Sequence, residues 1–187
     1  IDLNAVRDSL EIVIRGAMDG AETVKRLLAF ARPRQEGEPQ QVDLGEILRD
    51  TAKLTAPIWR DAAQEQGRPI SLQVEATGQT TVSGWPASLK EAITNLIINA
   101  VDALPHGGTI QLRARQQGKQ VVVEVIDSGV GMTPEVQENL FVPFFSTKGE
   151  RGSGLGMPIV YSIIQRHQGE IEVESRPGHG TTFRLTF

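Results

Sequence analysis

Over residues 1–32, apolar residues recur alternately three and four positions apart, and most positions between them are polar or charged. The recurring residues are Leu3, Val6, Leu10, Val13, Ala17, Gly20, Val24, Leu27 and Ala31. This heptad repeat predicts one long amphipathic helix whose apolar stripe packs against another helix. A single helix lying on a globular domain is the alternative interpretation. Because the residue before a proline avoids the helical conformation, we expect the helix to end at Pro33 and residues 33–41 to form a polar linker.

In the remaining chain, residues 42–187, segments with helical periodicity alternate with strand-like segments. A helix is expected to begin after Asp43, an N-cap residue with Glu46 three positions later, and to end or kink at Pro57. The other expected elements are strands at 69–75 and 80–83, a helix at 86–104, a hairpin with its turn at 117–119, a helix at 155–167 and a final hairpin with strands at 169–175 and 181–187. This order predicts a two-layer α/β sandwich, in which helices cover one face of a mixed sheet.

The helix expected at 86–104 carries a polar stripe along an otherwise apolar segment. Glu91, Asn95, Asn99 and Asp102 are spaced by four, four and three positions, so they share one face of a helix. Two amides framed by two carboxylates offer oxygen ligands to a hard cation, and this face therefore indicates a site for Mg²⁺ and phosphate. Asn99 is the first candidate for a metal ligand, and Asn95 can add a second ligand or hold phosphate. Glu91 is placed to act as a base or to orient an attacking group, whereas Asp102 can equally cap the helix end.

The segment 121–127 is an apolar strand that ends in an acid and is followed by two glycines, Gly129 and Gly131. Asp127 is therefore expected at a strand end that faces a pocket, and the glycines allow the chain to approach closely there. A carboxylate in this place can accept a hydrogen bond from the exocyclic amine of adenine, and it rejects guanine, which presents a carbonyl oxygen instead. A simple turn is the alternative interpretation of the same residues.

A second glycine cluster leads into the helix expected at 155–167. It consists of Gly152, Gly154 and Gly156, with Leu155 between the last two. Backbone amides at the start of this helix would point at a triphosphate, and the glycines would keep the approach open. The cluster therefore indicates residues that hold the phosphates of a nucleotide.

Between the two glycine clusters lies a segment of about twenty residues that is rich in small and polar side chains but holds Phe141, Phe144 and Phe145. The three aromatics are expected to dock a mobile lid on the domain. Lys148 is expected to reach the γ-phosphate and offset its charge. A plain surface loop with a solvated lysine is the alternative interpretation.

The chain has 187 residues, a formal net charge of −4 and no cysteine. The charge and the lack of a Lys/Arg run argue against nucleic acid or an anionic membrane as the main partner. Disulfides and thiolate metal sites are excluded. No apolar run approaches the roughly 20 residues that span a bilayer, so we expect this fragment to be cytoplasmic and to make no membrane contact. Its start at Ile1 suggests a longer protein, with room for an anchor outside this chain.

Four motifs follow one another along the chain: EAITNLIINAVD at 91–102, DSGVGM at 127–132, FVPFFSTK at 141–148 and GSGLGM at 152–157. Together they resemble the ATP-binding domain of bacterial sensor histidine kinases, whose Bergerat-type nucleotide pocket is shared by gyrase, the Hsp90 chaperones and mismatch-repair ATPases. The resemblance implies ATP and Mg²⁺ as cofactors, and it makes Asn95 and Asn99 the nucleotide and metal residues of an asparagine box. It also implies that Thr181 supports Asp127 near adenine. Met157 stands where the family usually has Leu.

The heptad segment looks like the second helix of the family's dimerisation hairpin, which implies a homodimer. The family's phosphoacceptor histidine precedes an acidic residue, but His106, His167 and His179 do not, so the acceptor is expected upstream of Ile1. The implied function is a sensor histidine kinase that phosphorylates this histidine from ATP, for relay to the aspartate of a response-regulator receiver domain. The alternatives are a serine kinase of the anti-sigma-factor type and a non-catalytic ATP-sensing interaction module.

Overall fold

The computed structural model describes residues 37–149 and 152–187, together with six isolated positions near the start of the chain. These positions, all with helical backbone, are Arg7, Leu10, Val13, Ile14, Gly16 and Gly20. The heptad helix expected over residues 1–32 therefore lies mostly outside the described residues, as does its expected end at Pro33. The chain divides into two units, Ile1–Gln35 and Glu36–Phe187.

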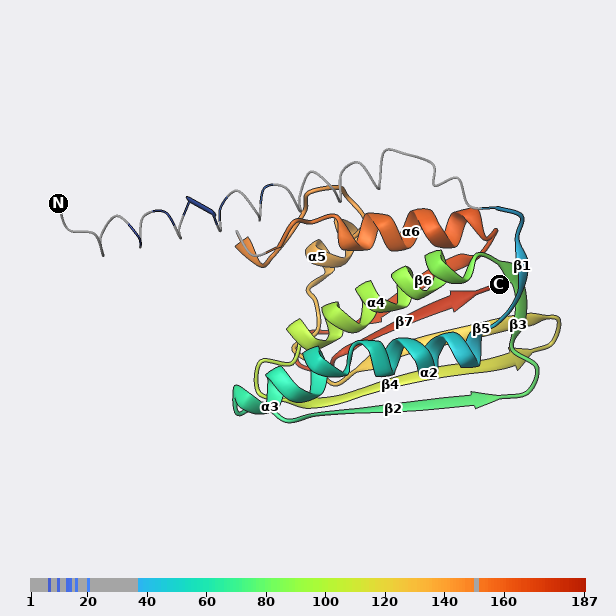
Figure 1. Ribbon diagram of the computed structural model, residues 1–187, viewed down its shortest axis with the longest axis horizontal. Helices are drawn as coiled ribbons and strands as arrows, with labels where there is room; N and C mark the ends of the chain where they lie inside the picture. Colours follow the sequence, from blue (N-terminus) through green and yellow to red (C-terminus); the bar gives the residue numbers. More distant parts are fainter. Residues whose placement is uncertain are drawn as a thin grey trace. The chain divides into compact units, whose positions relative to one another are not determined.

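A five-stranded mixed sheet runs through the second unit in the order β2-β4-β5-β7-β6 (Figure 1). The strands are β2 (Ile70–Thr77), β4 (Gly108–Gln117), β5 (Gln120–Asp127), β6 (Glu170–Ser175) and β7 (Thr181–Thr186). β2 pairs with β4 in parallel, whereas the pairings of β4 with β5, β5 with β7, and β6 with β7 are antiparallel. Both predicted hairpins, β4-β5 and β6-β7, are confirmed.

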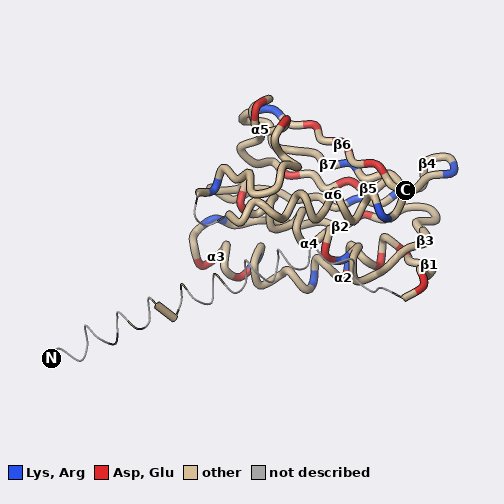
Figure 2. Tube along the Cα trace, turned by 90° about the horizontal axis from the view of Figure 1, so that it is seen from above, with Lys and Arg blue, Asp and Glu red and all other residues tan. Residues whose placement is uncertain are grey.

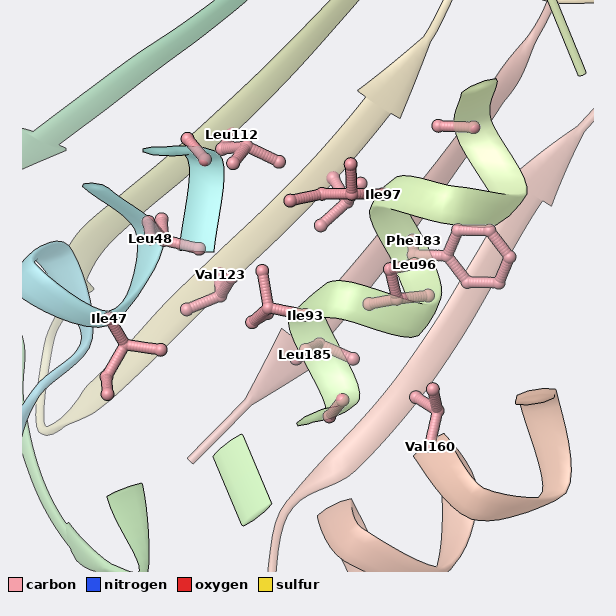
Figure 3. Close-up of a cluster of buried hydrophobic side chains, with 14 of the residues drawn as sticks. Ile47, Leu48, Ile93, Leu96, Ile97, Leu112, Val123, Val160, Phe183 and Leu185 are labelled. Carbon is pink, nitrogen blue, oxygen red and sulfur yellow. The ribbon is translucent and has the colours of Figure 1, made fainter. Parts of the chain in front are cut away.

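The three longest helices of this unit, α2 (Leu44–Leu54), α4 (Pro86–Asp102) and α6 (Gly156–Arg166), cover one face of the sheet (Figure 1). Their apolar sides meet the side chains of β4, β5 and β7 in the core, which Figure 3 shows in close-up. The most deeply buried side chains include Leu48, Leu96, Ile97, Leu112 and Leu185. Full burial of such a side chain stabilises the fold by about 1.5–3 kcal/mol. The predicted two-layer α/β sandwich is confirmed.

Helix α2 begins and ends where the sequence predicts. The Asp43 carboxylate accepts a hydrogen bond from the Gly45 N–H at 2.8 Å and another from the Thr80 hydroxyl, and these bonds make Asp43 the N-cap. The Thr80 bond is the main cause of the lowered pKa of Asp43. The helix ends at Leu54, and Pro57 opens a π-helical turn, η1 (Pro57–Ala62), followed by the short α3 (Ala63–Glu65).

A two-stranded antiparallel ribbon, β1 (Gln40–Asp43) with β3 (Thr81–Gly84), precedes α2 and α4. Gln40 and Gln41, which we expected in the linker, form the first half of β1. The sequence did not predict this strand, because Val42 is the one apolar residue among its four residues and no alternation of apolar and polar residues results. Val42 is also the one residue of β1 that is buried in the core.

Trp85 and His167 join the start of α4 to the end of α6. The Trp85 backbone N–H donates to Nε2 of His167 at 3.1 Å, while Nδ1 of the same ring lies 2.8 Å from the carbonyl oxygen of Ile163. The indole N–H of Trp85 donates to the carbonyl oxygen of Gly37 at 2.6 Å, and the Arg166 guanidinium lies 5.2 Å from the indole ring. The chain entering the domain is thus tied to both helices.

The face of the sheet opposite the helices carries a row of alternating charges, one on each strand. The row follows the strand register and consists of Glu75, Arg113, Glu124, Arg184 and Glu172. Arg184 bonds to Glu124 at 3.2 Å and to Glu172 at 3.4 Å. Glu124 is buried, and its carboxylate is neutralised by ion pairs with Arg184 and with Arg115, the latter at 3.3 Å. Figure 2 shows acidic and basic segments interspersed over this unit.

Within the described ranges, no helix has both the length and the apolar character needed to cross a membrane.

Candidate functional site

Helix α4 presents the polar stripe that the sequence predicts. Its apolar residues are buried, whereas Glu91, Asn95 and Asn99 are half-buried and Asp102 is exposed. The Asn95 side-chain amide donates to the carbonyl oxygen of Glu91 at 3.1 Å. A Cβ on Gly156, the first residue of α6, would lie 3.4 Å from Oδ1 of Asn95. The stripe therefore borders the start of α6, which is the second element expected at the phosphates.

Lys148 extends from the lid to the far end of this stripe. Its ammonium donates to Oδ1 of Asn99 at 3.0 Å and to Oδ2 of Asp102 at 2.6 Å. The Lys148 and Asp102 side chains are 37% and 42% exposed, so water screens this ion pair. We call Asn95, Asn99, Asp102 and Lys148 the Lys148 end of the site. The oxygen atoms of Asn99 and Asp102 hold the positively charged ammonium of Lys148, and a cation site requires oxygen atoms placed in this way.

Asp127 lies at the end of β5, and its side chain is only 6% exposed. Oδ1 accepts a hydrogen bond from the Gly129 N–H at 2.8 Å. Burial raises the pKa of the Asp127 carboxyl, and hydrogen bonds from the backbone N–H groups of Gly129 and Thr181 oppose this rise. The carboxylate is thus held in a fixed orientation by the backbone of two strand ends.

The glycines after Asp127 allow the chain to pass close to neighbouring backbone. A Cβ on Gly129 would clash with the carbonyl oxygen of Ala103 at the end of α4. Gly131 has φ +66°, and a Cβ there would clash with the carbonyl oxygen of Arg176. This loop is therefore packed between the end of α4 and the β6-β7 turn, which fixes the strand end that carries Asp127.

Thr181 is the register partner of Asp127 on β7, and it is buried. Its hydroxyl lies 3.0 Å from the hydroxyl of Ser175, the partner of Thr181 on β6. The Ser175 hydroxyl also accepts from the Met132 N–H at 2.9 Å and donates to the carbonyl oxygen of Gly180 at 3.0 Å. We call Asp127, Gly129, Gly131, Thr181 and Ser175 the Asp127 end of the site.

The second glycine cluster connects the lid to α6. Gly154 has φ +64°, and its carbonyl oxygen accepts from the Phe144 N–H at 3.0 Å, so a side chain there would clash with the lid backbone. Leu155 is fully buried and precedes α6 without a side-chain cap on the helix. In the first turn of α6, Pro158 has no N–H and the Ile159 N–H bonds to the carbonyl oxygen of Leu155, so the N–H groups of Gly156 and Met157 are the ones left without a side-chain cap. Gly152 lies next to Ser146 of the lid.

The lid contains a short helix that the sequence reading missed, α5 (Pro134–Glu138). Phe141 packs partly against the core and lies 5.3 Å from the Tyr161 ring of α6, measured between ring centroids. Phe145 is half-buried. Our expectation for Phe144 was wrong, because its side chain is 61% exposed and its φ of +69° turns the backbone instead.

The structure thus brings the predicted residues together in two groups. The Lys148 end combines α4, the lid and the start of α6, and the Asp127 end combines β5, β7 and the loop after Asp127. Sequence reasoning missed Ser175, although a signal exists: in strand 169–175 the inward positions are Ile171, Val173 and Ser175, so a polar residue interrupts an apolar series. Among the described residues, no cluster of three or more His, Cys, Asp or Glu side chains could hold a metal ion.

Comparison with known proteins shows the family to which this domain belongs. The family "Histidine kinase-, DNA gyrase B-, and HSP90-like ATPase" matches residues 84–187. The sensor histidine kinase ZraS of Klebsiella oxytoca is 39% identical over 162 residues, which are 86% of this chain and 33% of that protein. The chain therefore spans about a third of the length of this relative.

Solved structures of histidine kinases have the same fold as this chain. The catalytic domain of the histidine kinase ThkA superposes with a TM-score of 0.68 at 27% identity, over 81% of this chain and 95% of that chain. Full-length ShkA in complex with AMPPNP gives a TM-score of 0.77 at 27% identity, over 96% of this chain and 38% of that chain. ThkA in complex with the response regulator TrrA gives 0.75 at 24% identity, over 100% of this chain and 52% of that chain, a likeness that shows the fold alone. The chain belongs to the family of histidine kinase-, DNA gyrase B- and HSP90-like ATPases, and it carries the ATP-binding domain of a sensor histidine kinase.

Proposed function

We propose that this domain binds Mg·ATP and that the protein containing it transfers the γ-phosphoryl group to a histidine of its own dimerisation hairpin. The observation that carries this proposal is the buried Asp127 carboxylate, which is oriented by backbone N–H groups at a strand end in a chain of this ATPase family. An isolated buried carboxylate destabilises a fold, so its presence there favours a binding role.

Asp127 would accept a hydrogen bond from the exocyclic amine of adenine. Thr181, beside it on β7, would support this contact. Guanine would place a carbonyl oxygen against the carboxylate, and two acceptors in contact repel each other. Gly129 and Gly131 would contribute by letting the loop pack closely behind Asp127, and the base would be selected at this end of the site.

The phosphates would lie at the Lys148 end. The uncapped start of α6 offers backbone N–H groups near Asn95, in the region of Gly152, Gly154, Leu155 and Gly156. Lys148 would leave its present partners, Asn99 and Asp102, and neutralise the γ-phosphate instead. The lid would close over the nucleotide by this exchange of partners.

The residues present fit a Mg²⁺ ion. Asn99 and Asp102 already hold the ammonium of Lys148 through their oxygen atoms, and amide and carboxylate oxygens are the ligand types that Mg²⁺ prefers. Asn99 would be a ligand, and Asn95 would be a second ligand or a phosphate contact. When bound, the ion would neutralise charge on the phosphates.

In the transfer step, a ring nitrogen of the acceptor histidine would attack the γ-phosphorus. A nitrogen–phosphorus bond would form while the bond to the β–γ bridging oxygen breaks, and ADP would leave with that electron pair. Glu91 would orient the imidazole or take its proton. The domain would contribute mainly alignment and charge neutralisation.

The expected partners follow from the same proposal. The heptad segment would pair in a homodimer, and the phosphoryl group would pass to an aspartate of a response-regulator receiver domain. ThkA, whose catalytic domain is 27% identical to this chain, has itself been crystallised in complex with a response regulator, TrrA. We expect the domain to work in the cytoplasm, where ATP is available.

A labelling experiment tests the proposal. The chain, extended upstream by one hairpin helix, is incubated with γ-labelled Mg·ATP, and the label's stability to acid and base is measured. Label that survives base and is lost in acid indicates phosphohistidine, as we expect. Acid-stable label would indicate a serine kinase of the anti-sigma-factor type. ATP binding without any label would indicate an ATP-sensing interaction module.

A further inference from the structure

Three polar side chains form a row across β5, β7 and β6 on the helix-covered face of the sheet. Asp127 is paired with Thr181, and Thr181 is paired with Ser175. The next residues of the same face are apolar: Val125 on β5, Phe183 on β7 and Val173 on β6. Asp127 and Thr181 are buried, and Ser175, which is half-buried, is the member of this polar row that lies farthest from Asp127.

The hydrogen bonds of Ser175 determine where the neighbouring protons lie. Its oxygen accepts from the Met132 N–H, and its single proton must serve the carbonyl oxygen of Gly180, which can only accept. The Thr181 hydroxyl, 3.0 Å away, must then donate its own proton to Ser175. The Thr181 oxygen, on the register partner of Asp127, is left with lone pairs only.

We infer that Ser175 is a positioning residue for base selection, because it keeps the Thr181 hydroxyl from donating at the Asp127 end of the site. The Asp127 carboxylate and the Thr181 oxygen are then two hydrogen-bond acceptors, and together they match the two N–H groups of the exocyclic amine of adenine. A base with a carbonyl in that place would find no donor from Thr181. This inference rests on the proposed binding of ATP.

The test measures equilibrium dissociation constants of the 187-residue chain for ATP and for ITP, whose hypoxanthine carries a carbonyl in place of the amine. In Ser175→Ala, the Thr181 proton is free to turn toward the base. We expect the preference for ATP over ITP to fall about tenfold, through weaker ATP binding and stronger ITP binding. Ser175→Thr keeps the hydroxyl and should restore the preference.

Ser128→Ala is the matched control. The Ser128 hydroxyl also accepts a backbone N–H, that of Thr109 at 3.0 Å, and it follows Asp127 directly in the chain. Because no hydrogen bond joins the Ser128 hydroxyl to Thr181 in the described structure, loss of this hydroxyl should leave the ATP/ITP preference unchanged. Thr181→Val supplies a second control, since Ser175→Ala added to it should no longer change the preference.

If Ser175 had a purely structural role, Ser175→Ala would weaken the binding of ATP and of ITP equally. The ratio of their dissociation constants would then stay unchanged, and this result would overturn the inference. If Ser175→Ala does not fold, Ser175→Cys is used instead, because it keeps a side chain of similar shape with a weaker hydrogen-bond donor. The ratio of the dissociation constants for ATP and ITP is then measured in that variant. Failure of the unmodified chain to bind ATP would instead overturn the proposed function, so the two failures are distinct.

Discussion

The two ends of the site differ in how they are held. At the Asp127 end, the carboxylate is 6% exposed, and its partners are N–H groups of the backbone. At the Lys148 end, two exposed side chains, Lys148 and Asp102, meet across the surface. They are 46 positions apart in the sequence, and the segment between them includes the first glycine cluster and most of the lid. Backbone contacts fix one end, whereas a screened ion pair holds the other.

This difference matches two demands of nucleotide binding. In the proposed function the Asp127 end selects the base, which requires donors and acceptors that cannot turn to suit the wrong base, and the backbone hydrogen bonds to Asp127 meet this requirement. Phosphate transfer requires a lid that opens and closes, so its contacts must be weak enough to exchange. An exposed ion pair contributes about 0–1 kcal/mol, which satisfies that condition.

The largest effect is expected for Asp127→Asn. The amide would place a donor or a neutral oxygen where a carboxylate faced the adenine amine, and ATP affinity should fall at least about thousandfold. Isothermal titration with ATP measures this loss, and circular dichroism checks that the variant is folded. Tight ATP binding by this variant would contradict the role of Asp127 and remove the basis of the comparison.

The same variant tests the burial of the Asp127 carboxyl through the pH dependence of thermal stability. Burial raises the pKa of Asp127 above its usual value of 3.8, so the folded protein favours the protonated group. The stability from this preference is complete below the usual pKa and is lost as the pH rises through the folded pKa. We therefore expect Asp127→Asn to have a higher Tm than the unmodified chain at pH 7, and the difference to shrink near pH 3.

Asn99→Asp is expected to affect the other end. The base contacts should persist, but the altered oxygen set around the metal should slow phosphoryl transfer about hundredfold, or about 2.7 kcal/mol. The measurements are the rate of phosphoryl transfer from γ-labelled ATP, in the chain extended upstream by one hairpin helix, and the binding of adenosine without metal. Asp102→Asn, which removes a charge from the same end, is the matched comparison. A large loss of adenosine binding in Asn99→Asp would show that the two ends are not independent.

A pair of glycine variants compares the two ends by stability. Gly131→Ala places a Cβ against the Arg176 carbonyl at a φ of +66°, and we expect a loss of about 2–3 kcal/mol in the free energy of unfolding. Gly149 of the lid has a similar φ of +58°, but no atom of the described residues lies within 4 Å of such a Cβ, so Gly149→Ala should lose only about 1 kcal/mol. Urea denaturation measures both, and equal losses would argue against a rigid Asp127 end.

Lys148→Met should have the smallest effect on stability. Loss of the exposed pair with Asp102 is expected to change the free energy of unfolding by less than about 0.5 kcal/mol. Lys90→Met, which breaks the exposed pair with Asp50 outside the site, is the control. A change above about 2 kcal/mol in Lys148→Met alone would mean that the lid is firmly fixed and would contradict the proposed exchange of partners.

Sequence periodicity predicted the elements that bury an apolar face. Helix α4 was located to within two residues because its apolar and polar stripes both follow helical spacing, and both hairpins were located from their turns. Strand β1 was missed because Gln40 and Gln41 carry no apolar signal. Short, polar elements depend on partners elsewhere in the chain, and local patterns do not show them.

For the site, the sequence predicted residue types and spacing but not every partner. The pairing of Lys148 with Asn99 joins positions 49 residues apart in the sequence, and it depends on how the lid folds back over α4. The exposure of Phe144 follows from the backbone turn near Gly154. Ser175 was missed because its role depends on two register pairings, from β5 to β7 and from β7 to β6.

The row of charges on the open face of the sheet also bears on how two copies of this domain would meet. β6 is an edge strand, and its outward residues Glu170, Glu172 and Glu174 are all exposed. Arg184 on the neighbouring strand bonds to two of these glutamates from the inner side. Two β6 edges brought together would oppose six carboxylates across a gap of one strand spacing. The β6 edge is thereby protected against pairing with the β6 edge of a second copy, even at the high local concentration that a dimer imposes.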